Sequence, residues 1–285
     1  MFVCEEKLLN VGGVKIAYTE CGPQDGRVFF CVHGLLSNGR DYDFLAQDLA
    51  QTGYRVICMD LPGRGKSDWF IDKSQYQPPF YIPYCLALIS EVTKGAGFDW
   101  FGVSLGGMIG LALSVMEGVR LERLILVDIG AEVPAAGLDA VSKLAKFSPE
   151  FKTQNEAASF LKIRCSQWGI TEDAVWDHLI AHNIKPHGDG YIMHYDPAIG
   201  AALPEKNETL AFWDLWRNVR QPLLLIRGEE SVLLPLSVAN AMRGCYGGKV
   251  FDSITFAGCG HVPNLMEAAQ INKVLMHINA PSFVA

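Results

Sequence analysis

Short apolar runs recur along the chain and predict the strands of a sheet. Several are hydrophobic nearly throughout, as strands covered on both faces are. Two strand-like runs, Glu5–Leu9 and Val14–Glu20, come first, joined by a turn at Gly12 and Gly13. The later runs are Val28–Val32, Tyr54–Met59, Phe98–Val103, Leu121–Asp128, Leu223–Arg227 and Val250–Phe256. Helical patterns alternate with these later runs, which predicts an α/β fold of mainly parallel strands with crossover helices.

The interval between Asp128 and Pro222 departs from this alternation. It has no strong strand pattern, but it has helical patterns at Ala136–Phe147, Asn155–Gln167, Thr171–Asn183 and Leu210–Asn218. Such a segment is too long for a crossover connection and too regularly patterned for a loop. We therefore predict a core of residues 1–128 and 221–285, with residues 129–220 inserted as a helical cap.

Four tryptophans in the predicted cap have two readings. They either line a pocket beneath the cap or pack the cap onto the core, and packing is the commoner role of aromatic side chains. These residues are Trp168, Trp176, Trp213 and Trp216.

Composition narrows the class of partner. With 49% hydrophobic and 19% charged residues, the chain can bury a sizeable core. Its net charge of -7 and pI near 5.5 disfavour a nucleic acid or an anionic membrane as partner. No uninterrupted apolar run is long enough to span a bilayer, and acidic residues stand where a signal peptide needs basic ones. We expect a small-molecule substrate, and the oligomeric state stays open.

The eight cysteines contain no CxxC pair and no Cys/His ligand cluster, so we expect no structural metal. Cys31 and Cys58 lie in apolar runs, where a free thiol behaves as a small hydrophobe. These features predict a reduced, cytoplasmic protein.

The strongest local motif is Gly102-Val103-Ser104-Leu105-Gly106, which fits G-x-S-x-G. It follows a predicted strand and begins a predicted helix over Leu105–Met116. A turn this tight strains the serine backbone and exposes its Oγ, while the helix directs N–H groups at an oxyanion. Ser104 is therefore the candidate nucleophile.

Two histidines lie where an active site needs them. His261 follows the last strand, at the edge where parallel sheets carry functional groups, and is the candidate base. His33 and Gly34 end an earlier strand; there the Leu35 N–H could join that of Leu105 as an oxyanion hole. His33 itself is better suited to supporting that loop than to catalysis.

His178 and His182 stand four residues apart in the cap and could hold a metal, but no third ligand is evident. A solvated helix face is the simpler interpretation.

Taken together, the motifs resemble those of the α/β-hydrolase family over nearly the whole chain. They are "HGLLSN", "MDLPGRGKSD", "GVSLGG", "LILVDIG" and "GCGH", with "HYDPAI" in the cap. The resemblance implies a mostly parallel eight-stranded sheet flanked by helices and a helical cap after the sixth strand. It also implies a triad in the chain order serine, acid, histidine.

The position of the acid departs from the family pattern. Relatives carry it after the seventh strand, but the corresponding stretch "RGEESVLLP" has Ser231 or Val232 there. We expect Asp128, at the end of the sixth strand, to replace it. Glu229 or Glu230 could do so instead, in which case Asp128 would cap the next turn through its carboxylate.

We expect a serine hydrolase that cleaves carboxylic esters through an acyl-enzyme, without cofactor or metal. Lactone, thioester and carbon–carbon bond hydrolysis use the same apparatus. The alternative is a small-molecule receptor on the same scaffold, which the missing acid alone would favour, because a fold does not determine function.

Overall fold

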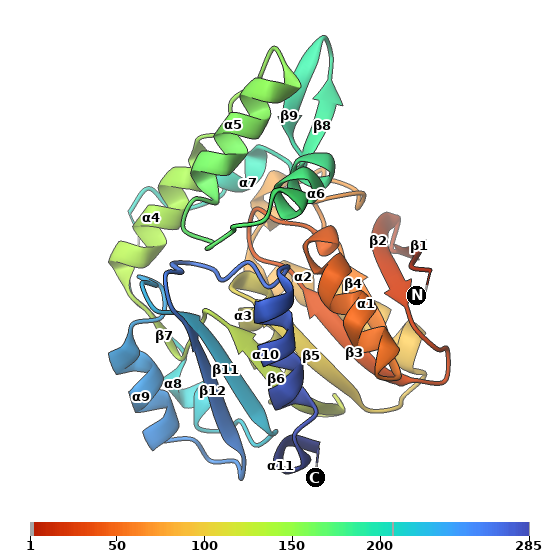
Figure 1. The fold of residues 1–285 in the computed structure, drawn as a ribbon, viewed down its shortest axis with the longest axis vertical. Coiled ribbons are helices and arrows are strands. Elements are labelled where there is room, and N and C mark those ends of the chain that lie inside the picture. Colours follow the sequence, from red (N-terminus) through yellow and green to blue (C-terminus); the bar gives the residue numbers. More distant parts are fainter. Residues whose placement is uncertain (1–2, 207, 285) are drawn as a thin grey trace.

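The computed structural model describes residues 3–206 and 208–284 and has an eight-stranded sheet at its centre (Figure 1). The strand order is β1-β2-β4-β3-β5-β6-β11-β12. The strands are β1 (Glu5–Val11), β2 (Val14–Cys21), β3 (Arg27–Val32), β4 (Tyr54–Met59), β5 (Phe98–Val103), β6 (Leu121–Val127), β11 (Leu223–Gly228) and β12 (Phe251–Phe256). Strand β2 is antiparallel to β1 and β4, and the other pairs are parallel. The predicted fold class is confirmed.

Alternating side chains of the central strands face two hydrophobic clusters, one on each side of the sheet. Phe30 and Trp100 belong to one cluster, and their neighbours Phe29 and Phe101 belong to the other. The first cluster includes residues of α2 (Pro78–Thr93), α3 (Leu105–Leu113), α8 (Trp213–Trp216) and α9 (Leu236–Gly244). The second includes residues of α1 (Asp43–Gln51), α10 (Ala268–Ile278) and α11 (Pro281–Val284). This burial on both faces explains why the central strands are apolar throughout.

The segment between β6 and β11 lies mostly above the carboxyl ends of the strands, at the top of Figure 1. Its helices are α4 (Ala135–Lys146), α5 (Gln154–Arg164), α6 (Asp173–Asn183), the short α7 (Ala198–Ala201) and α8, which packs against the core. Two short 3-10 helices elsewhere, η1 (Gly39–Tyr42) and η2 (Lys73–Gln75), complete the helical elements of the described ranges. Trp216 of α8 is fully buried against the core and donates to the Met242 carbonyl at 3.0 Å.

Short strands in this segment were not predicted. They are β7 (Glu132–Val133), β8 (Ile184–His187), β9 (Gly190–Met193) and β10 (Leu210–Ala211), which pair as β7–β10 and β8–β9. The predicted helix Leu210–Asn218 is wrong at its start, where β10 pairs with β7. Ladders of two to four residues carry too little alternation to register as a pattern, and Pro186 weakens the β8 pattern further.

The cysteine prediction needs one correction. Cys4 and Cys21 form a disulfide, because the β1–β2 register sets Glu5 opposite Glu20 and so brings the two flanking cysteines together. Their separation of 17 residues does not mark them as a pair in the sequence. Six cysteines are free, and Cys31 and Cys58 are buried in the core as expected. The cytoplasmic location stays a prediction.

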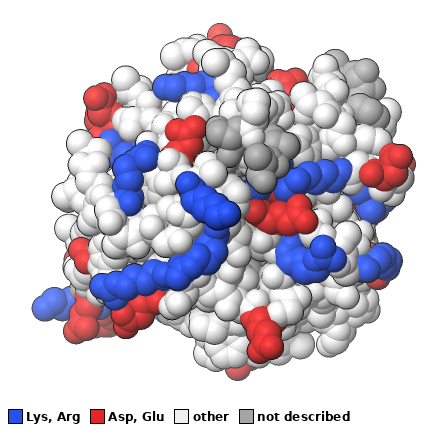
Figure 2. Space-filling view, turned by 90° about the horizontal axis from the view of Figure 1, so that it is seen from below, with Lys and Arg blue, Asp and Glu red and all other residues white. Residues whose placement is uncertain are grey.

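Within the described ranges, no helix combines the length and the apolar character that crossing a membrane requires. Figure 2 shows the face seen from below, where blue Lys and Arg side chains lie interspersed with red Asp and Glu side chains.

Candidate active site

Ser104 occupies the turn between β5 and α3 with φ 49° and ψ −109°. A positive φ is strained for any residue with a side chain. The neighbouring glycines make the turn possible. A Cβ on Gly106 would lie 2.0 Å from the Val32 carbonyl oxygen, and one on Gly102 would lie 2.3 Å from the Gly106 oxygen. The elbow therefore presents Ser104 at the carboxyl edge of the sheet.

Ser104, His261 and Asp128 form one chain of hydrogen bonds. His261 Nε2 lies 3.1 Å from Ser104 Oγ, and His261 Nδ1 lies 2.7 Å from Asp128 Oδ2. Asp128 is fully buried, and the His261 side chain is 17% exposed. With Nδ1–H donating to the carboxylate, Nε2 is left as an acceptor for the serine proton. Three residues from three separate loops are thus brought together.

Asp128 is held by the loop that follows β11. Gly228 N–H donates to its Oδ1 at 3.1 Å, and the Ser231 hydroxyl donates to its Oδ2 at 2.5 Å. Ser231 Oγ in turn accepts from the N–H groups of Leu233 and Leu234, each at 3.2 Å. The hydroxyl proton and both lone pairs of Ser231 are therefore used.

Ser231 is a supporting residue that sequence reasoning treated only as a missing acid. The available signal was its position in the loop after β11, where its hydroxyl bonds the same Asp128 oxygen that contacts His261. Asp128 reaches that histidine from the neighbouring strand end, with a left-handed φ of 54° that aspartate tolerates better than most residues. Glu229 and Glu230 are exposed, and neither has a described hydrogen bond to His261.

The oxyanion candidates, the N–H groups of Leu35 and Leu105, flank Ser104. Leu105 is the first residue of α3, so its N–H has no partner within the helix. Leu35 follows Gly34, where an added Cβ would lie only 3.6 Å from Ser104 Cβ. The loop of Gly34 and Leu35 therefore runs directly beside Ser104.

The His33 ring supports this loop by contacting backbone groups. Its Nδ1 lies 2.7 Å from the Gly34 carbonyl oxygen, and its Nε2 accepts from the Leu61 N–H at 3.0 Å. Burial, reinforced by the charge of Arg64, lowers the pKa of His33 to about 3, so the ring is neutral. Both ring nitrogens contact backbone, which is the supporting arrangement expected from the sequence.

A small pocket of about 80 Å³ opens beside Ser104 and His261. Ser104, His261 and Leu35 line it together with Arg164 and Trp168 of the inserted segment. Of the four tryptophans considered, Trp168 is the one in this lining. Trp176 packs against Lys162, and Trp213 donates a hydrogen bond to Glu132. Trp216 is in the core.

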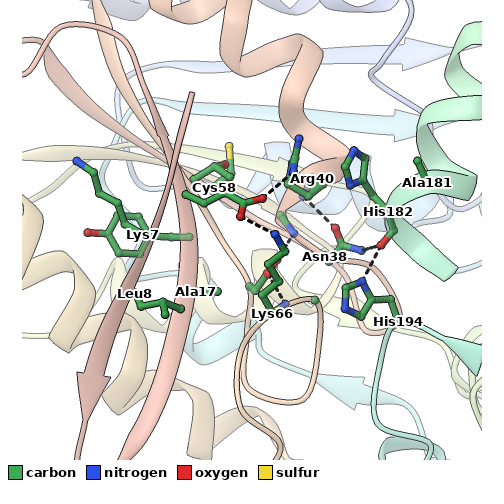
Figure 3. A pocket seen from close by; sticks show the side chains of 16 residues that line it. Lys7, Leu8, Ala17, Asn38, Arg40, Cys58, Lys66, Ala181, His182 and His194 are labelled. Carbon is green, nitrogen blue, oxygen red and sulfur yellow. Dashed lines mark hydrogen bonds and ion pairs between the residues drawn. The ribbon is translucent and has the colours of Figure 1, made fainter. Parts of the chain in front are cut away.

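A larger cavity of about 540 Å³ lies elsewhere and contains no triad residue (Figure 3). Lys7, Arg40, Lys66, His182 and His194 reach it, and Asn38 and His194 converge on the His182 carbonyl oxygen. Acidic groups there offset the cations, since Glu6 bridges Arg40 and Lys66. This mixture of charges does not define a ligand.

The structure corrects the expectation that His178 and His182 lack a third ligand. A carboxylate oxygen of Asp43 and one nitrogen of each histidine lie within 4.8 Å of one another. However, Asp43 pairs with Arg40 at 2.5 Å, and His178 Nε2 lies 2.8 Å from the Arg40 carbonyl oxygen. Because Asp43 and His178 already have protein partners, we interpret their contacts with Arg40 as joining α6 to η1.

Two of the family-like motifs meet where the inserted segment joins the core. Asp196, of "HYDPAI", accepts from Tyr76 OH at 2.6 Å and from Lys73 Nζ at 2.5 Å. Its backbone N–H donates to the Gly63 carbonyl at 2.7 Å. Asp196 therefore ties the segment above the sheet to the loop after β4.

Comparison with known proteins agrees with this architecture. Residues 29–274 match the alpha/beta hydrolase family. The chain is 32% identical, over 271 residues and 90% of each protein, to a 3-hydroxybutyrate-oligomer hydrolase of Cupriavidus necator. It is 33% identical over 219 residues to esterase Rv0045c of Mycobacterium tuberculosis, covering 72% of this chain and 66% of that protein. An alpha/beta hydrolase from Novosphingobium aromaticivorans superposes with a TM-score of 0.83 at 26% identity, over 96% of this chain and 97% of that one. The chain belongs to the alpha/beta hydrolase family.

Proposed function

We propose that this protein hydrolyses carboxylic esters through an acyl-enzyme formed on Ser104. Relatives named hydrolase and esterase support ester hydrolysis in general. The observation that carries the finer proposal is the hydrogen-bond chain from Ser104 Oγ through His261 to buried Asp128. No cofactor is needed for this chemistry.

In the first step His261 Nε2 takes the hydroxyl proton as Ser104 Oγ attacks the ester carbonyl carbon. Asp128 stabilises the imidazolium, and the Leu35 and Leu105 N–H groups stabilise the tetrahedral oxyanion. One such donor is worth about 10²–10³ in rate. The imidazolium then returns the proton to the leaving alcohol, and a water deacylates Ser104 by the same route.

We propose that residues 129–220 act as a lid that selects the substrate. Trp168 and Arg164 support this role, because both belong to the inserted segment and line the triad pocket. The small volume of that pocket favours small to medium esters. Dimers and trimers of 3-hydroxybutyrate are the first compounds to test, since a relative that is 32% identical is named for them.

The receptor alternative has less support once the site is assembled. Its one argument was the missing acid, and Asp128 lies at hydrogen-bond distance from His261 Nδ1. Ligand binding alone would also not require a histidine Nε2 that faces a serine hydroxyl.

A fluorophosphonate probe and a panel of p-nitrophenyl esters from acetate to dodecanoate test the proposal. We expect a covalent label on Ser104 and turnover that is fastest with the shorter acyl chains. A correctly folded protein that neither reacts with the probe nor turns over any ester would overturn it.

A further inference from the structure

Arg164, the last residue of α5, lies in the same pocket as the proposed nucleophile. Among the twelve residues that line this pocket, it is the single Lys or Arg, and none is Asp or Glu. Its Nη1 atom is buried and has no hydrogen-bond partner. A guanidinium thus enters the substrate pocket with a donor left unused.

The surroundings of Arg164 do not neutralise it. No ion pair joins it to a carboxylate in the part of the chain that the structure describes, and its Cζ lies 5.6 Å from the centroid of the Tyr195 ring. Burial has the largest effect on the pKa of Arg164 and lowers it, but the neighbouring Cys165, Tyr195 and Asp41 together raise it above its usual value. Asp41 is itself buried and accepts a hydrogen bond from Asn183 at 3.1 Å.

Buried arginines elsewhere in the chain have more complete partners. Arg123 donates two hydrogen bonds to Asp99, at 2.9 and 2.5 Å, and others to Tyr54 and the Ile278 carbonyl. Arg64 also leaves Nη2 unpaired, but its Nε and Nη1 bond two carbonyls and Tyr81, and it does not line the pocket. Arg164 therefore differs from both, because it leaves Nη1 without a partner in a side chain that lines the pocket beside Ser104.

The chemistry of the side chain indicates the missing partner. Leaving a charged donor buried and unpaired is costly, so such groups are found paired. Guanidinium presents a planar fork that fits the two oxygens of a carboxylate. We propose that Arg164 binds a free carboxylate of the substrate, so that the site takes esters carrying an acid group, such as ester-linked hydroxy acids and monoesters of dicarboxylic acids. This inference rests on the proposed ester hydrolysis at Ser104.

Matched pairs of esters test the inference. Monoethyl succinate, glutarate and adipate carry one carboxylate, and the corresponding diethyl esters carry none. We expect Arg164→Gln to lower kcat/KM for the best monoester by about 10- to 100-fold, the loss of charge-assisted hydrogen bonds, with little change for its diester. Lys162→Gln, on the same helix but exposed and outside the pocket, is the matched control and should change neither.

Two results would overturn the inference. One is an equal loss on monoesters and diesters, which would mean that Arg164 only supports the pocket. The other is no loss on either. If Arg164→Gln does not fold, Arg164→Lys and the wild-type protein decide: Arg164→Lys should keep part of the wild-type preference for the monoester over the diester, because it keeps the charge, and glutarate should inhibit wild type more strongly than glutaramide. Equal inhibition by the acid and the amide would contradict carboxylate binding.

A binding measurement separates this inference from the proposed reaction. Titration of Ser104→Ala with glutarate reports on Arg164 without turnover, and Ser104→Ala/Arg164→Gln should lose the binding. If glutarate binds through Arg164 but no ester is cleaved, the reaction is wrong and the carboxylate site stands. If esters are cleaved but Arg164→Gln does not change glutarate binding, the proposed reaction stands and the carboxylate site is wrong.

Discussion

Replacing Asp128 by asparagine tests the relocated acid directly. The backbone should tolerate the change, because asparagine accepts the left-handed φ of 54° at this position as readily as aspartate. The Gly228 N–H, 3.1 Å from Oδ1, needs an acceptor, so it holds the amide oxygen there. The amide NH₂ must then occupy the Oδ2 position and face His261 Nδ1.

That orientation reverses the donor and acceptor roles of the two His261 ring nitrogens. An NH₂ donor 2.7 Å from Nδ1 makes Nδ1 the acceptor and moves the ring proton to Nε2, which then cannot take the Ser104 proton. Loss of a triad acid in this way lowers kcat by about 10³–10⁴, or about 4–5.5 kcal/mol of barrier. The lost hydrogen bonds cost the fold about 1.5–3 kcal/mol, so the variant should remain folded.

The same geometry predicts a partial rescue. Ser231 Oγ is 2.5 Å from the atom that binds His261, and an aspartate at 231 reaches one bond further. Its carboxylate could also accept the Leu233 and Leu234 N–H groups that Ser231 Oγ accepts in the native protein. We expect kcat of Asp128→Asn/Ser231→Asp to be about tenfold or more above that of Asp128→Asn. This gain is a small part of the contribution of a triad acid.

Initial rates on p-nitrophenyl butyrate give kcat and KM for wild type and each variant, with circular dichroism and a melting curve to establish folding. Glu229→Gln and Glu230→Gln are matched acidic controls from the same loop and should each cost much less than Asp128→Asn. A folded Asp128→Asn with kcat within about tenfold of wild type would refute Asp128 as the triad acid. A larger loss in Glu229→Gln or Glu230→Gln would assign the acid to that glutamate.

Three further predictions use other parts of the site. Ser104→Ala should abolish both ester turnover and the fluorophosphonate label, and mass spectrometry that finds the label on another serine would contradict the mechanism. Trp168→Leu should change the relative kcat/KM among acyl chain lengths, whereas Trp213→Leu, outside the pocket, should scale all substrates alike; equal scaling by both would remove the selecting role of Trp168. His33 is buried and neutral with a pKa of about 3, so the unfolded chain binds its proton first as the pH falls below about 6.5, and stability should drop between these values. Urea midpoints measured across this pH range should fall less steeply with decreasing pH in His33→Gln than in wild type. The same dependence on pH in both proteins would contradict the lowered pKa of His33.

Local sequence determined much of the active-site framework. The apolar runs specify buried strands, because a strand covered on both faces has no polar side. The glycines around Ser104 specify the elbow, since any Cβ there would collide with backbone. The placement of His261 after the last strand follows from strand order alone, as carboxyl ends of parallel strands share one edge. Because no aspartate follows the seventh strand, the sequence leaves Asp128, Glu229 and Glu230 as candidates for the acid.

Tertiary structure brings Asp128, and neither glutamate, to hydrogen-bond distance from His261 within the described residues. Asp128 and Ser231 are 103 residues apart, and only the β6–β11 pairing sets their side chains against each other. Likewise, Cys4 meets Cys21 through a hairpin register, and Arg164 enters the pocket through the packing of α5 above the sheet. Sequence patterns report the preferences of neighbouring residues for burial and backbone shape. Hydrogen bonds between distant loops depend on which strands are adjacent and how far each loop extends, and these are properties of the assembled sheet.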